Sequence, residues 1–444
     1  MTRRVLVANR GEIAVRVIRA ARDLGIETVA VYSAADRDAA HVALADRAVC
    51  IGPAAAAGSY LRADLLLHTA IATGCDAVHP GYGFLSEDAG FAERVEREGL
   101  TFVGPPSPVI EQLGNKVTAR GVAQRAEVPI VPGSPDAVAD VEEAARLAKE
   151  SGYPVLLKAR AGGGGRGMRV VGDEQQLRAA FPLASHEAAG AFGDDGLYVE
   201  RYLTRVRHVE VQILADQYGH VEALGERDCT LQRRHQKVLE EAPCPVLSGR
   251  QREEICAAAV RVARAAGYVN AGTVEFLFDL DSQSFFFIEM NTRIQVEHPI
   301  TELLTGVDLV AWQFRVADGQ KVESLNAHSR GHAIECRITA EDWRADFLPS
   351  PGRLAVFEPP AGPGVRVDSH CRQGTTITPH YDSLLAKLIV HGTDRGEALC
   401  RAKRALDEFR VEGVHTSVGM HRWLLEQPAV IEGNYTTNYL TEAL

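Results

Sequence analysis

Short apolar runs alternate with segments of helical periodicity along the first hundred residues. The runs Val5–Ala8 and Thr28–Tyr32 predict buried strands, because a strand covered on both faces is apolar throughout. Between them, apolar residues recur at three- and four-residue spacing from Ile13 to Leu24, which predicts a helix ended by Gly25. The alternation continues with helices and strands near 62–73, 77–79, 87–98 and 101–103. Repeated strand–helix–strand units predict a parallel sheet with right-handed crossovers.

A stretch rich in proline and valine, ending in glycine, at 128–133, marks a boundary. Beyond it we expect a helix at 141–151 and three strands at 153–158, 168–171 and 197–200. A strand-rich segment at 206–241 and a C-terminal helix at 397–409 follow. A glycine run joins the first two of these strands. A P-loop instead joins a strand to a helix, and no P-loop pattern occurs in the sequence. No Gly-x-Gly-x-x-Gly follows the first strand, so a dinucleotide is not indicated.

The composition narrows the class of protein. At roughly 100–200 residues per domain, 444 residues suit two to four domains. No apolar run approaches the ~20 residues of a membrane span, and the first residues do not form a secretory signal, so we expect a cytoplasmic protein. The net charge of −11 argues against general affinity for nucleic acid or for an anionic membrane. None of the eight cysteines stands in a Cys-x-x-Cys pair, so neither a zinc knuckle nor a disulfide framework is indicated.

The most informative segment runs from Phe285 to Pro299. Its apolar start predicts a buried strand, after which polar and apolar residues alternate. If the extended conformation continues, five polar side chains share one face: Glu289, Asn291, Arg293, Gln295 and Glu297. Buried polar groups are costly unless they meet ions, substrate or one another, so the pattern favours a site. The alternative is an edge strand whose polar face is solvated.

Glu275 is a second carboxylate with apolar neighbours. It lies on the predicted strand Thr273–Phe278, one short hairpin before Glu289. Two carboxylates and the amide of Asn291 on neighbouring strands suit Mg²⁺, a hard cation that prefers oxygen ligands. A lone glutamate in a strand is more often a rim residue, so the interpretation depends on the whole group.

Two further segments offer donors for an anion. The run Gly162–Gly167 would let backbone N–H groups approach phosphate oxygens closely, and Lys158 adds a positive charge just before it. Successive glycines are also typical of a flexible linker. The segment Gln232–Lys237 gathers amide, guanidinium, imidazole and ammonium donors. It suits a nucleic-acid patch or a small anion, and its acidic flanks and the negative net charge favour the small anion.

Several motifs spread over the chain carry a resemblance to a known family: Ala8–Ala14, His79–Glu87, Gly162–Met168, Arg233–Lys237, Glu289–Pro299, Phe347–Gly352 and Tyr381–Ser383. Over essentially its whole length the chain resembles the biotin carboxylase subunits of bacterial acetyl-CoA carboxylases, which are ATP-grasp enzymes. The resemblance implies a mixed α/β and α+β architecture. Its parts would be a Rossmann-like pre-ATP-grasp domain at 1–114, an ATP-grasp domain at 115–330 with a small mobile lid at about 132–203, and a mixed C-terminal domain at 331–444.

The resemblance also implies site residues, motif by motif. ATP would contact Lys116, Lys158, Gly164, Gly165, Glu200, Arg201, Tyr202, Leu203, His208, Gln232, His235, Glu275 and Glu289. Within this set, Glu200 and the backbone of Arg201 and Leu203 would hold adenine. Mg²⁺ or Mn²⁺ would bind Glu275, Glu289 and Asn291, bicarbonate would bind Lys237, Arg293, Gln295 and Val296, and biotin would meet Tyr82, Gly83 and Arg337.

Two positions depart from the family pattern. The family usually has lysine where Arg201 stands, which a contact through the backbone tolerates. Arg160 and Ala161 lie in a stretch that usually holds serine and glycine, and this difference would stiffen the hinge of the lid.

The implied reaction has two stages, with Arg293, Glu297, Arg337 and Lys237 as its catalytic residues. Glu297 would act as general base on bicarbonate, which attacks the γ-phosphate of ATP and gives carboxyphosphate and ADP. Carboxyphosphate decays to CO₂ and phosphate, and the phosphate removes the N1′ proton of biotin. Arg337 would stabilise the biotin enolate, which attacks CO₂. A competing interpretation makes Glu297 a structural partner of Arg293.

The implied role is the ATP-dependent carboxylation of biotin, the first half-reaction of acetyl-CoA carboxylase in fatty acid synthesis, by a homodimer. Because the sequence has no Met-Lys-Met biotinylation motif, we expect the biotin carboxyl carrier protein and the carboxyltransferase to be separate chains. We expect neither nucleic acid nor membrane as a partner. The alternatives are the equivalent chain of a propionyl-CoA, other acyl-CoA or pyruvate carboxylase and, more distantly, a catalytically silent ATP-binding regulatory subunit.

Overall fold

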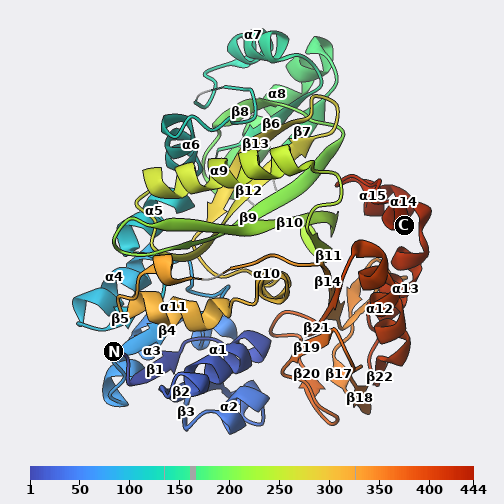
Figure 1. The fold of residues 1–444 in the computed structure, drawn as a ribbon. Coiled ribbons are helices and arrows are strands. Elements are labelled where there is room, and N and C mark those ends of the chain that lie inside the picture. The colour runs from blue at the N-terminus through green and yellow to red at the C-terminus, as the bar shows by residue number, and fades with distance from the viewer. Residues whose placement is uncertain (135, 161–166, 326) are drawn as a thin grey trace.

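The computed structural model describes residues 1–134, 136–160, 167–325 and 327–444. Figure 1 shows the N-terminal part at the lower left, a small unit at the top, and the C-terminal helices at the right, with long strands crossing the middle. The glycines expected to supply lid amides, Gly164 and Gly165, lie outside the described residues, as does Ala161.

The N-terminal part contains a parallel sheet with strand order β3-β2-β1-β4-β5, which confirms the predicted strand–helix–strand repetition. The strands are β1 (Arg4–Val7), β2 (Glu27–Ser33), β3 (Arg47–Gly52), β4 (Ala77–His79) and β5 (Thr101–Phe102). The helices are α1 (Gly11–Asp23), α2 (Ala40–Leu44), α3 (Ala63–Ala72), α4 (Ala89–Arg97), α5 (Ser107–Gly114) and α6 (Lys116–Arg125). The loops after β1 and β4 meet, because Asn9 Nδ2 donates to the carbonyls of Pro80 and Tyr82 at 2.7 Å.

The small unit at the top of Figure 1 is an antiparallel sheet covered by two helices. Its strands are β6 (Val155–Ala159), β7 (Met168–Val171) and β8 (Leu197–Arg201), and its helices are α7 (Val141–Ser151) and α8 (Glu174–Phe192). It has a hydrophobic core of its own, which includes Leu157 and Val199. This unit lies within the segment expected to form the lid.

An eight-stranded sheet occupies the middle of the molecule, in the order β13-β12-β9-β10-β11-β14-β21-β19. Its strands are β9 (Val206–Ala215), β10 (Val221–Arg233), β11 (Gln236–Ala242), β12 (Asn270–Asp279), β13 (Ser284–Asn291), β14 (His332–Thr339), β19 (Val365–Ser369) and β21 (Leu384–Gly392). The pairing of β11 with β14 carries the sheet across the expected domain border at residues 330 and 331.

The two faces of this sheet differ in chemistry. Val209, Val211 and Phe276 pack against α9 (Gly249–Ala265) in one hydrophobic core. Since side chains alternate along a strand, the residues between them point to the opposite face. The helices α10 (His298–Thr305) and α11 (Leu309–Ala317) contact strands of the same sheet. The face opposite α9 carries the candidate residues His208, Glu275 and Glu289.

The remaining elements belong to the C-terminal part and to short turns. They are β15 (Glu341–Asp342), β16 (Leu348–Pro349), β17 (Gly352–Arg353), β18 (Val356–Glu358), β20 (Thr376–Ile377), β22 (Arg410–Glu412), α12 (Arg395–Glu408), α13 (Val418–Glu426), α14 (Pro428–Glu432), α15 (Tyr439–Ala443) and the 3₁₀ turns Ala34–Asp36, Ala56–Gly58 and Val322–Ser324. The predicted C-terminal helix is confirmed as α12. The chain returns to the large sheet near its end, where buried Arg207 stacks on the ring of Tyr435 at 3.7 Å.

One expectation about the backbone is wrong. The extended conformation does not continue to Glu297, because β13 ends at Asn291 and α10 begins at His298. Pro299 suits the first turn of a helix, where its missing N–H has no partner to lose, and it favours the turn into α10. The polar residues beyond Asn291 are therefore arranged by an irregular loop.

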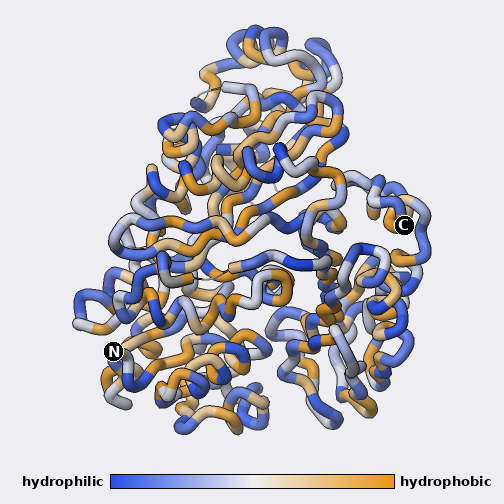
Figure 2. The backbone as a smooth tube through the Cα atoms, viewed as in Figure 1, coloured by the Kyte–Doolittle hydropathy of each residue, from blue (hydrophilic) through white to orange (hydrophobic). Residues whose placement is uncertain are grey.

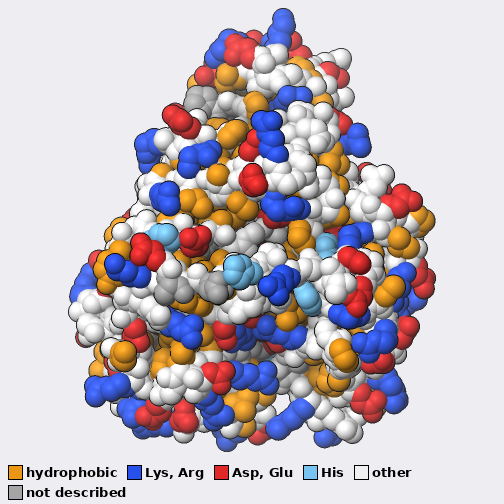
Figure 3. All heavy atoms as spheres, in the orientation of Figure 1, with side chains coloured by type: hydrophobic (Ala, Val, Ile, Leu, Met, Phe, Trp, Pro, Cys, Tyr) orange, Lys and Arg blue, Asp and Glu red, His pale blue; other side chains and the backbone are white. Residues whose placement is uncertain are grey.

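Hydrophobic and hydrophilic residues alternate along the strands in the middle of the molecule, and hydrophobic segments are also frequent in the N-terminal part at the lower left (Figure 2). Charges of both signs are interspersed over the face seen in Figure 3. Within the described part of the chain, no helix is both long and apolar enough to cross a membrane.

Phe276 offers a test of the core beneath the site. It is fully buried and forms edge-to-face contacts with Phe285 and Phe287. We expect Phe276→Ala to lower the free energy of unfolding by about 3–5 kcal/mol, because it leaves a cavity. Leu183→Ala is the control, since Leu183 is 58% exposed, and it should change stability by less than about 0.5 kcal/mol. Equal effects of the two variants in urea unfolding would contradict the assignment of this core.

Candidate active site

A row of charged residues crosses the large sheet. Glu275 on β12 lies opposite Glu289 on β13 and, on its other side, opposite Glu210 on β9. Arg227 on β10 continues the row opposite Glu210. Directly opposite residues of antiparallel strands share a face, so three carboxylates and a guanidinium meet on the face away from α9.

The ammonium of Lys237 lies among these carboxylates. Its Nζ is 2.5 Å from Glu210 Oε2, 3.0 Å from Glu275 Oε1 and 2.7 Å from Glu297 Oε1. These partners match the three N–H donors of an ammonium group. Burial opposes the charge, but the carboxylates hold the pKa of Lys237 well above its ordinary value. Lys237 is therefore a permanent cation at the centre of the site.

Glu275 has polar partners beside both of its oxygens. Its Oε1 also accepts hydrogen bonds from Asn291 Nδ2 at 2.9 Å and Gln295 Nε2 at 3.0 Å, and its Oε2 lies 3.1 Å from His208 Nε2. Burial opposes the charged form of Glu275, yet Lys237 and His208 lower its pKa well below the ordinary value. The sequence predicted Glu275, Glu289 and Asn291 as one group, and the structure places Glu275 opposite Glu289 and in hydrogen-bond contact with Asn291.

The chemistry of the expected metal ligands fits a hard divalent cation. Burial and then repulsion by Glu275 raise the pKa of Glu289. A divalent cation would relieve this crowding of negative charge, and carboxylate and amide oxygens are its preferred ligands. The potential ligand atoms of His208, Glu210 and Glu275 also lie within 4.8 Å of one another, so Glu275 is oriented toward β9 in this arrangement.

Glu297 joins two cations. Its Oε1 accepts from Lys237, and its Oε2 accepts from Arg337 Nη2 at 2.9 Å. Burial would raise the pKa of Glu297, but Lys237 and Arg337 lower it below its ordinary value, so the carboxylate is ionised at neutral pH. Arg337 is fixed on its other side by Glu240 Oε1, 2.6 Å from its Nε.

The hydrogen bonds of Arg293 go to residues other than Glu297, so they do not support the competing interpretation of Glu297 as its structural partner. Arg293 Nε donates to Glu87 Oε2 at 2.9 Å, and its Nη2 donates to Asn291 Oδ1 at 3.2 Å. Glu87 comes from the loop after β4, so this pair ties the N-terminal part to the loop that follows β13.

The residues expected at the phosphates carry neighbouring positive charges. Lys116 begins α6, and burial followed by repulsion from Lys158 lowers its pKa. Lys158 Nζ lies 3.3 Å from Glu200 Oε2, and Arg120 also pairs with Glu200. Two ammonium groups that repel each other suit a site for an anion such as a phosphate group.

The residues expected at adenine follow the end of β8. The backbone N–H of Arg201 donates to the carbonyl of Pro132 at 2.7 Å, and that of Tyr202 donates to Pro154 at 2.9 Å. Those two N–H groups are therefore used within the fold in this arrangement. Leu203 is buried in a small cluster with Val131 and Val206.

Gln232, His235 and Lys237 belong to one hairpin. Gln232 lies opposite Lys237 near the end of β10 and β11, and Arg234 and His235 form the two-residue connection with positive φ at both positions. This is the geometry of the tight hairpin turns that match strand twist. His235 is exposed at the tip, whereas Gln232 is buried beside the site.

Tyr82 and Gly83 lie in the loop after β4. The Tyr82 hydroxyl donates to the Glu12 carboxylate of α1. Burial, reinforced by Glu12, raises the pKa of Tyr82 well above its ordinary value, and the charge of Arg337 is close enough to oppose the shift. The loop and Arg337 therefore face the same region.

Several site residues were not predicted from the sequence. They are Glu12, Glu87, Arg120, Glu210, Arg227, Glu240 and Lys387. A signal did exist for Glu210, since polar His208, Glu210 and Gln212 alternate with apolar residues along β9. The others are identified only by contacts between distant parts of the chain.

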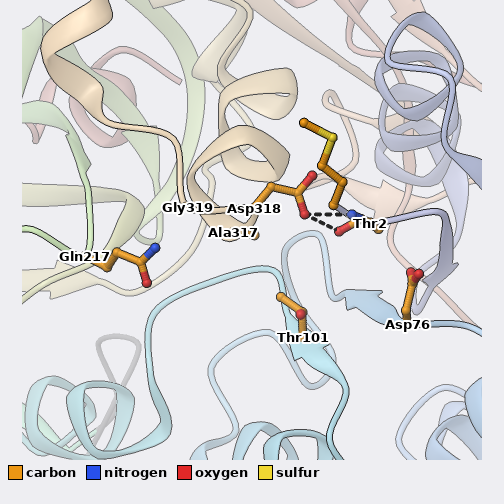
Figure 4. Close-up of a pocket in the computed structure, with 8 residues that line it drawn as sticks. Thr2, Asp76, Thr101, Gln217, Ala317, Asp318 and Gly319 are labelled. Carbon is orange, nitrogen blue, oxygen red and sulfur yellow. Dashed lines mark hydrogen bonds between the residues drawn. The ribbon is translucent and has the colours of Figure 1, made fainter.

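A pocket of about 280 Å³ lies apart from these residues (Figure 4). It is lined by Met1, Thr2, Asp76, Thr101, Gln217, Ala317, Asp318 and Gly319, none of which was predicted as a site residue. Thr2 donates to Asp318 Oδ1 through its backbone N–H at 2.7 Å and its hydroxyl at 2.8 Å. Thr2 and Asp318 thus hydrogen-bond to each other. The pocket lies where the N-terminal part contacts the end of α11.

Three family models match the chain along its length. "Biotin carboxylase, N-terminal domain" matches residues 1–110, "Carbamoyl-phosphate synthase L chain, ATP binding domain" matches residues 115–325, and "Biotin carboxylase C-terminal domain" matches residues 335–442. Biotin carboxylase 1 of Bacillus subtilis is 52% identical over 442 residues, which are 99% of this chain and 98% of that protein. A pyruvate carboxylase chain of Methanothermobacter thermautotrophicus is 49% identical over 100% of this chain and 90% of its own length.

Solved structures agree with these matches. A biotin carboxylase from Campylobacter jejuni, crystallised as a complex with a nucleotide, has a TM-score of 0.95 and 45% identity, covering 100% of this chain and 99% of that one. The biotin carboxylase domain dimer of the Hydrogenobacter thermophilus 2-oxoglutarate carboxylase, with MgADP, ADP and bicarbonate, has a TM-score of 0.93 and 47% identity, covering 100% and 98%.

The fold and the site define an ATP-binding ligase of the ATP-grasp superfamily, which confirms the predicted fold class. The chain belongs to the biotin carboxylase family, as the resemblance of its motifs indicated, and is thus an enzyme of the class that forms C–N bonds.

Glu335 gives a test of the electrostatics around Arg337. It is fully buried on β14 opposite Glu240, and neither of its carboxyl oxygens has a hydrogen-bond partner among the described residues. Burial, reinforced by Glu240, raises its pKa well above the ordinary value. A raised folded-state pKa means that stability is lost as the pH rises through that value.

Because the unfolded carboxyl ionises above about pH 4.5, we expect the parent to lose stability relative to Glu335→Gln from there upward. The advantage of Glu335→Gln, whose amide cannot ionise, should therefore be larger near pH 9 than near pH 6. Thermal unfolding at both pH values measures this difference. Glu253→Gln, which changes an exposed residue of α9, is the control. Its thermal stability should equal that of the parent at both pH values. A parallel pH dependence of the parent and Glu335→Gln would show that Glu335 is not a neutral acid in the folded protein.

Proposed function

We propose that the chain catalyses the ATP-dependent carboxylation of biotin with bicarbonate. The observation that carries the proposal is the contact of one buried carboxylate, Glu297, with both Lys237 and Arg337. This contact places a base beside the cation proposed for bicarbonate and beside the cation proposed for biotin. The two halves of the reaction would therefore share one small region.

ATP is proposed to bind between the small unit and the large sheet. Lys116 and Lys158 would contact its phosphates, and His208, Gln232, His235 and Tyr202 would border it, with Glu200 and the backbone of Arg201 and Leu203 at adenine. Glu275, Glu289 and Asn291 would hold Mg²⁺, which supplies neutralisation of phosphate charge when bound. The MgADP in the Hydrogenobacter structure supports this arrangement.

Bicarbonate is proposed to bind Lys237, Arg293, Gln295 and the backbone of Val296. An oxygen of bicarbonate attacks the γ-phosphorus of ATP, the bond from phosphorus to the ADP oxygen breaks, and Glu297 accepts the bicarbonate proton. The products of this step are carboxyphosphate and ADP. Glu297 is ionised and can therefore accept that proton, but Lys237 and Arg337 lower its pKa and with it its basicity. An anion bound beside Lys237 would offset part of this effect.

Biotin is proposed to bind at Tyr82, Gly83 and Arg337. Carboxyphosphate breaks down to CO₂ and phosphate, the phosphate takes the N1′ proton, and the biotin enolate forms a C–N bond with CO₂. Arg337 is fixed by Glu240 and Glu297, so its charge is already oriented for the developing oxyanion. A closed lid at about 132–203 would keep water from the intermediate.

Acetyl-CoA is the proposed final acceptor, with fatty acid synthesis as the role. The biotin carboxyl carrier protein and a carboxyltransferase would be its partners, and a homodimer its assembly. The Methanothermobacter relative, which belongs to a pyruvate carboxylase, supports the runner-up, in which pyruvate or another acyl-CoA is the acceptor. The division at 1–114, 115–330 and 331–444 and the cytoplasmic location stay predictions.

The purified chain tests the reaction directly. We expect release of ADP from ATP and Mg²⁺ only when bicarbonate and free biotin are both present, and transfer of labelled carbon from bicarbonate to biotin. Leaving out each substrate in turn provides the controls. ADP release that ignores biotin, or no labelled carboxybiotin at all, would contradict the proposed function.

Arg337→Ala tests the second stage. Loss of a fixed charge at a developing oxyanion should reduce the turnover of biotin carboxylation by ~10²–10³-fold. Arg264→Ala, on the exposed side of α9, is a control of equal charge change and should retain the activity of the parent. Near-normal biotin-dependent ADP release by folded Arg337→Ala would exclude the proposed role.

A further inference from the structure

Lys387 is a buried cation that the proposed reaction does not use. It is fully buried on β21, directly opposite Arg337 on β14. Its Nζ donates to the carbonyl of Val296 at 2.9 Å and lies 3.1 Å from Glu12 Oε1, with Asp368 Oδ2 at 4.0 Å. A buried ammonium is costly unless such partners compensate for its lost hydration.

Glu12 extends this contact to the biotin side. It is 4% exposed on α1, and its Oε1 accepts both from Lys387 and from the Tyr82 hydroxyl. The result is a continuous chain of polar contacts: the Val296 carbonyl, the Lys387 ammonium, the Glu12 carboxylate and the Tyr82 hydroxyl. Its two ends are the groups proposed for bicarbonate and for biotin.

The residues that form this series of polar contacts come from three separate parts of the sequence. Glu12 lies in the part matched by the N-terminal family model, Val296 in the ATP-binding part and Lys387 in the C-terminal part. Apolar residues could fill the same space with equal or greater stability. A charge-assisted chain adds a defined direction at each contact, which apolar packing does not.

We propose that Lys387 is a positioning residue that fixes the bicarbonate-binding loop and the biotin-binding loop at one separation. The inference rests on the proposed function of Val296 and Tyr82. CO₂ formed at one site must meet the biotin enolate at the other, and small displacements of reacting groups reduce rates strongly. Lys387 touches neither substrate and acts through Val296 and Glu12.

The direct test is Lys387→Met, which removes the ammonium and keeps an unbranched side chain. We expect the KM values for bicarbonate and for biotin each to rise about tenfold or more, because each loop loses a charge-assisted contact. The KM for ATP should change by less than about twofold. A folded variant whose KM for bicarbonate and KM for biotin both stay at the parent values would overturn the proposal.

A double-mutant cycle separates positioning from direct contact. Tyr82→Phe removes only the hydroxyl, so it should raise the KM for biotin and leave the KM for bicarbonate unchanged. Adding it to Lys387→Met should raise the KM for biotin no further, since the link is already broken. Additive effects would show that the Tyr82 hydroxyl acts without Lys387 and would overturn the chain of contacts.

Glu302→Gln is the matched control. Glu302 on α10 binds Arg16 of α1 and Arg366 of β19, each at 2.8 Å, so it also joins three parts of the chain. Because its ion pairs are made with these arginines and not with the chain from Val296 to Tyr82, we expect lower thermal stability with both KM values within about twofold of the parent. If Glu302→Gln also raises the KM for bicarbonate and the KM for biotin about tenfold, the role of Lys387 is only structural and the proposal fails.

Two further measurements keep the outcome decisive. If Lys387→Met does not fold, Glu12→Gln replaces it, and an unchanged KM for biotin in that variant would overturn the link. If the parent chain shows no biotin-dependent ADP release, the proposed function is wrong, and a crystal structure of Lys387→Met still tests the geometry. Unmoved loops at 80–84 and 292–297 would then refute positioning by Lys387.

Discussion

The site depends on the contact of one ammonium, Lys237, with three buried carboxylates. Glu210 and Glu275 are brought together by strand register and Glu297 by the loop before α10, so like charges converge in a region that excludes water. Without a cation at their centre, this arrangement would be strongly unfavourable. The same excess of negative charge suits a site that takes up a divalent cation and then an anion beside Lys237.

Because the large sheet is continuous, it also places Arg337 and Lys387 near the contact of Lys237 with the carboxylates. Pairing of β11 with β14 brings Arg337 beside Glu297, and pairing of β14 with β21 brings Lys387 opposite Arg337. The N-terminal part contributes through the loop after β4, in which Glu87 is held by Arg293 and Tyr82 by Glu12. The groups proposed for catalysis are thus arranged by contacts between all three parts of the chain, which makes their mutual position a property of the whole fold.

Periodicity in the sequence predicted most of the N-terminal sheet, α7, the strands of the small unit and α12, because each has a local pattern. Glu275, Glu289 and Asn291 were predicted together for the same reason. The course of the loop after Asn291 was not predicted, because it is set by the start of α10 and by contacts with Glu87 and Lys387. No local pattern in the sequence predicts the roles of Glu240 and Lys387. The role of a buried charge on a strand depends on its partners, and these partners are remote in sequence.

Crystals of the chain grown with ADP and Mn²⁺ would test the proposed centre of the site most directly, because the anomalous signal of manganese locates the metal independently of any assumption. We predict one strong peak between the carboxylates of Glu275 and Glu289, beside the phosphates of ADP, with Lys237 turned away from Glu275 to some degree. Manganese and ADP found away from these two strands would contradict the assignment of this carboxylate row as the catalytic centre.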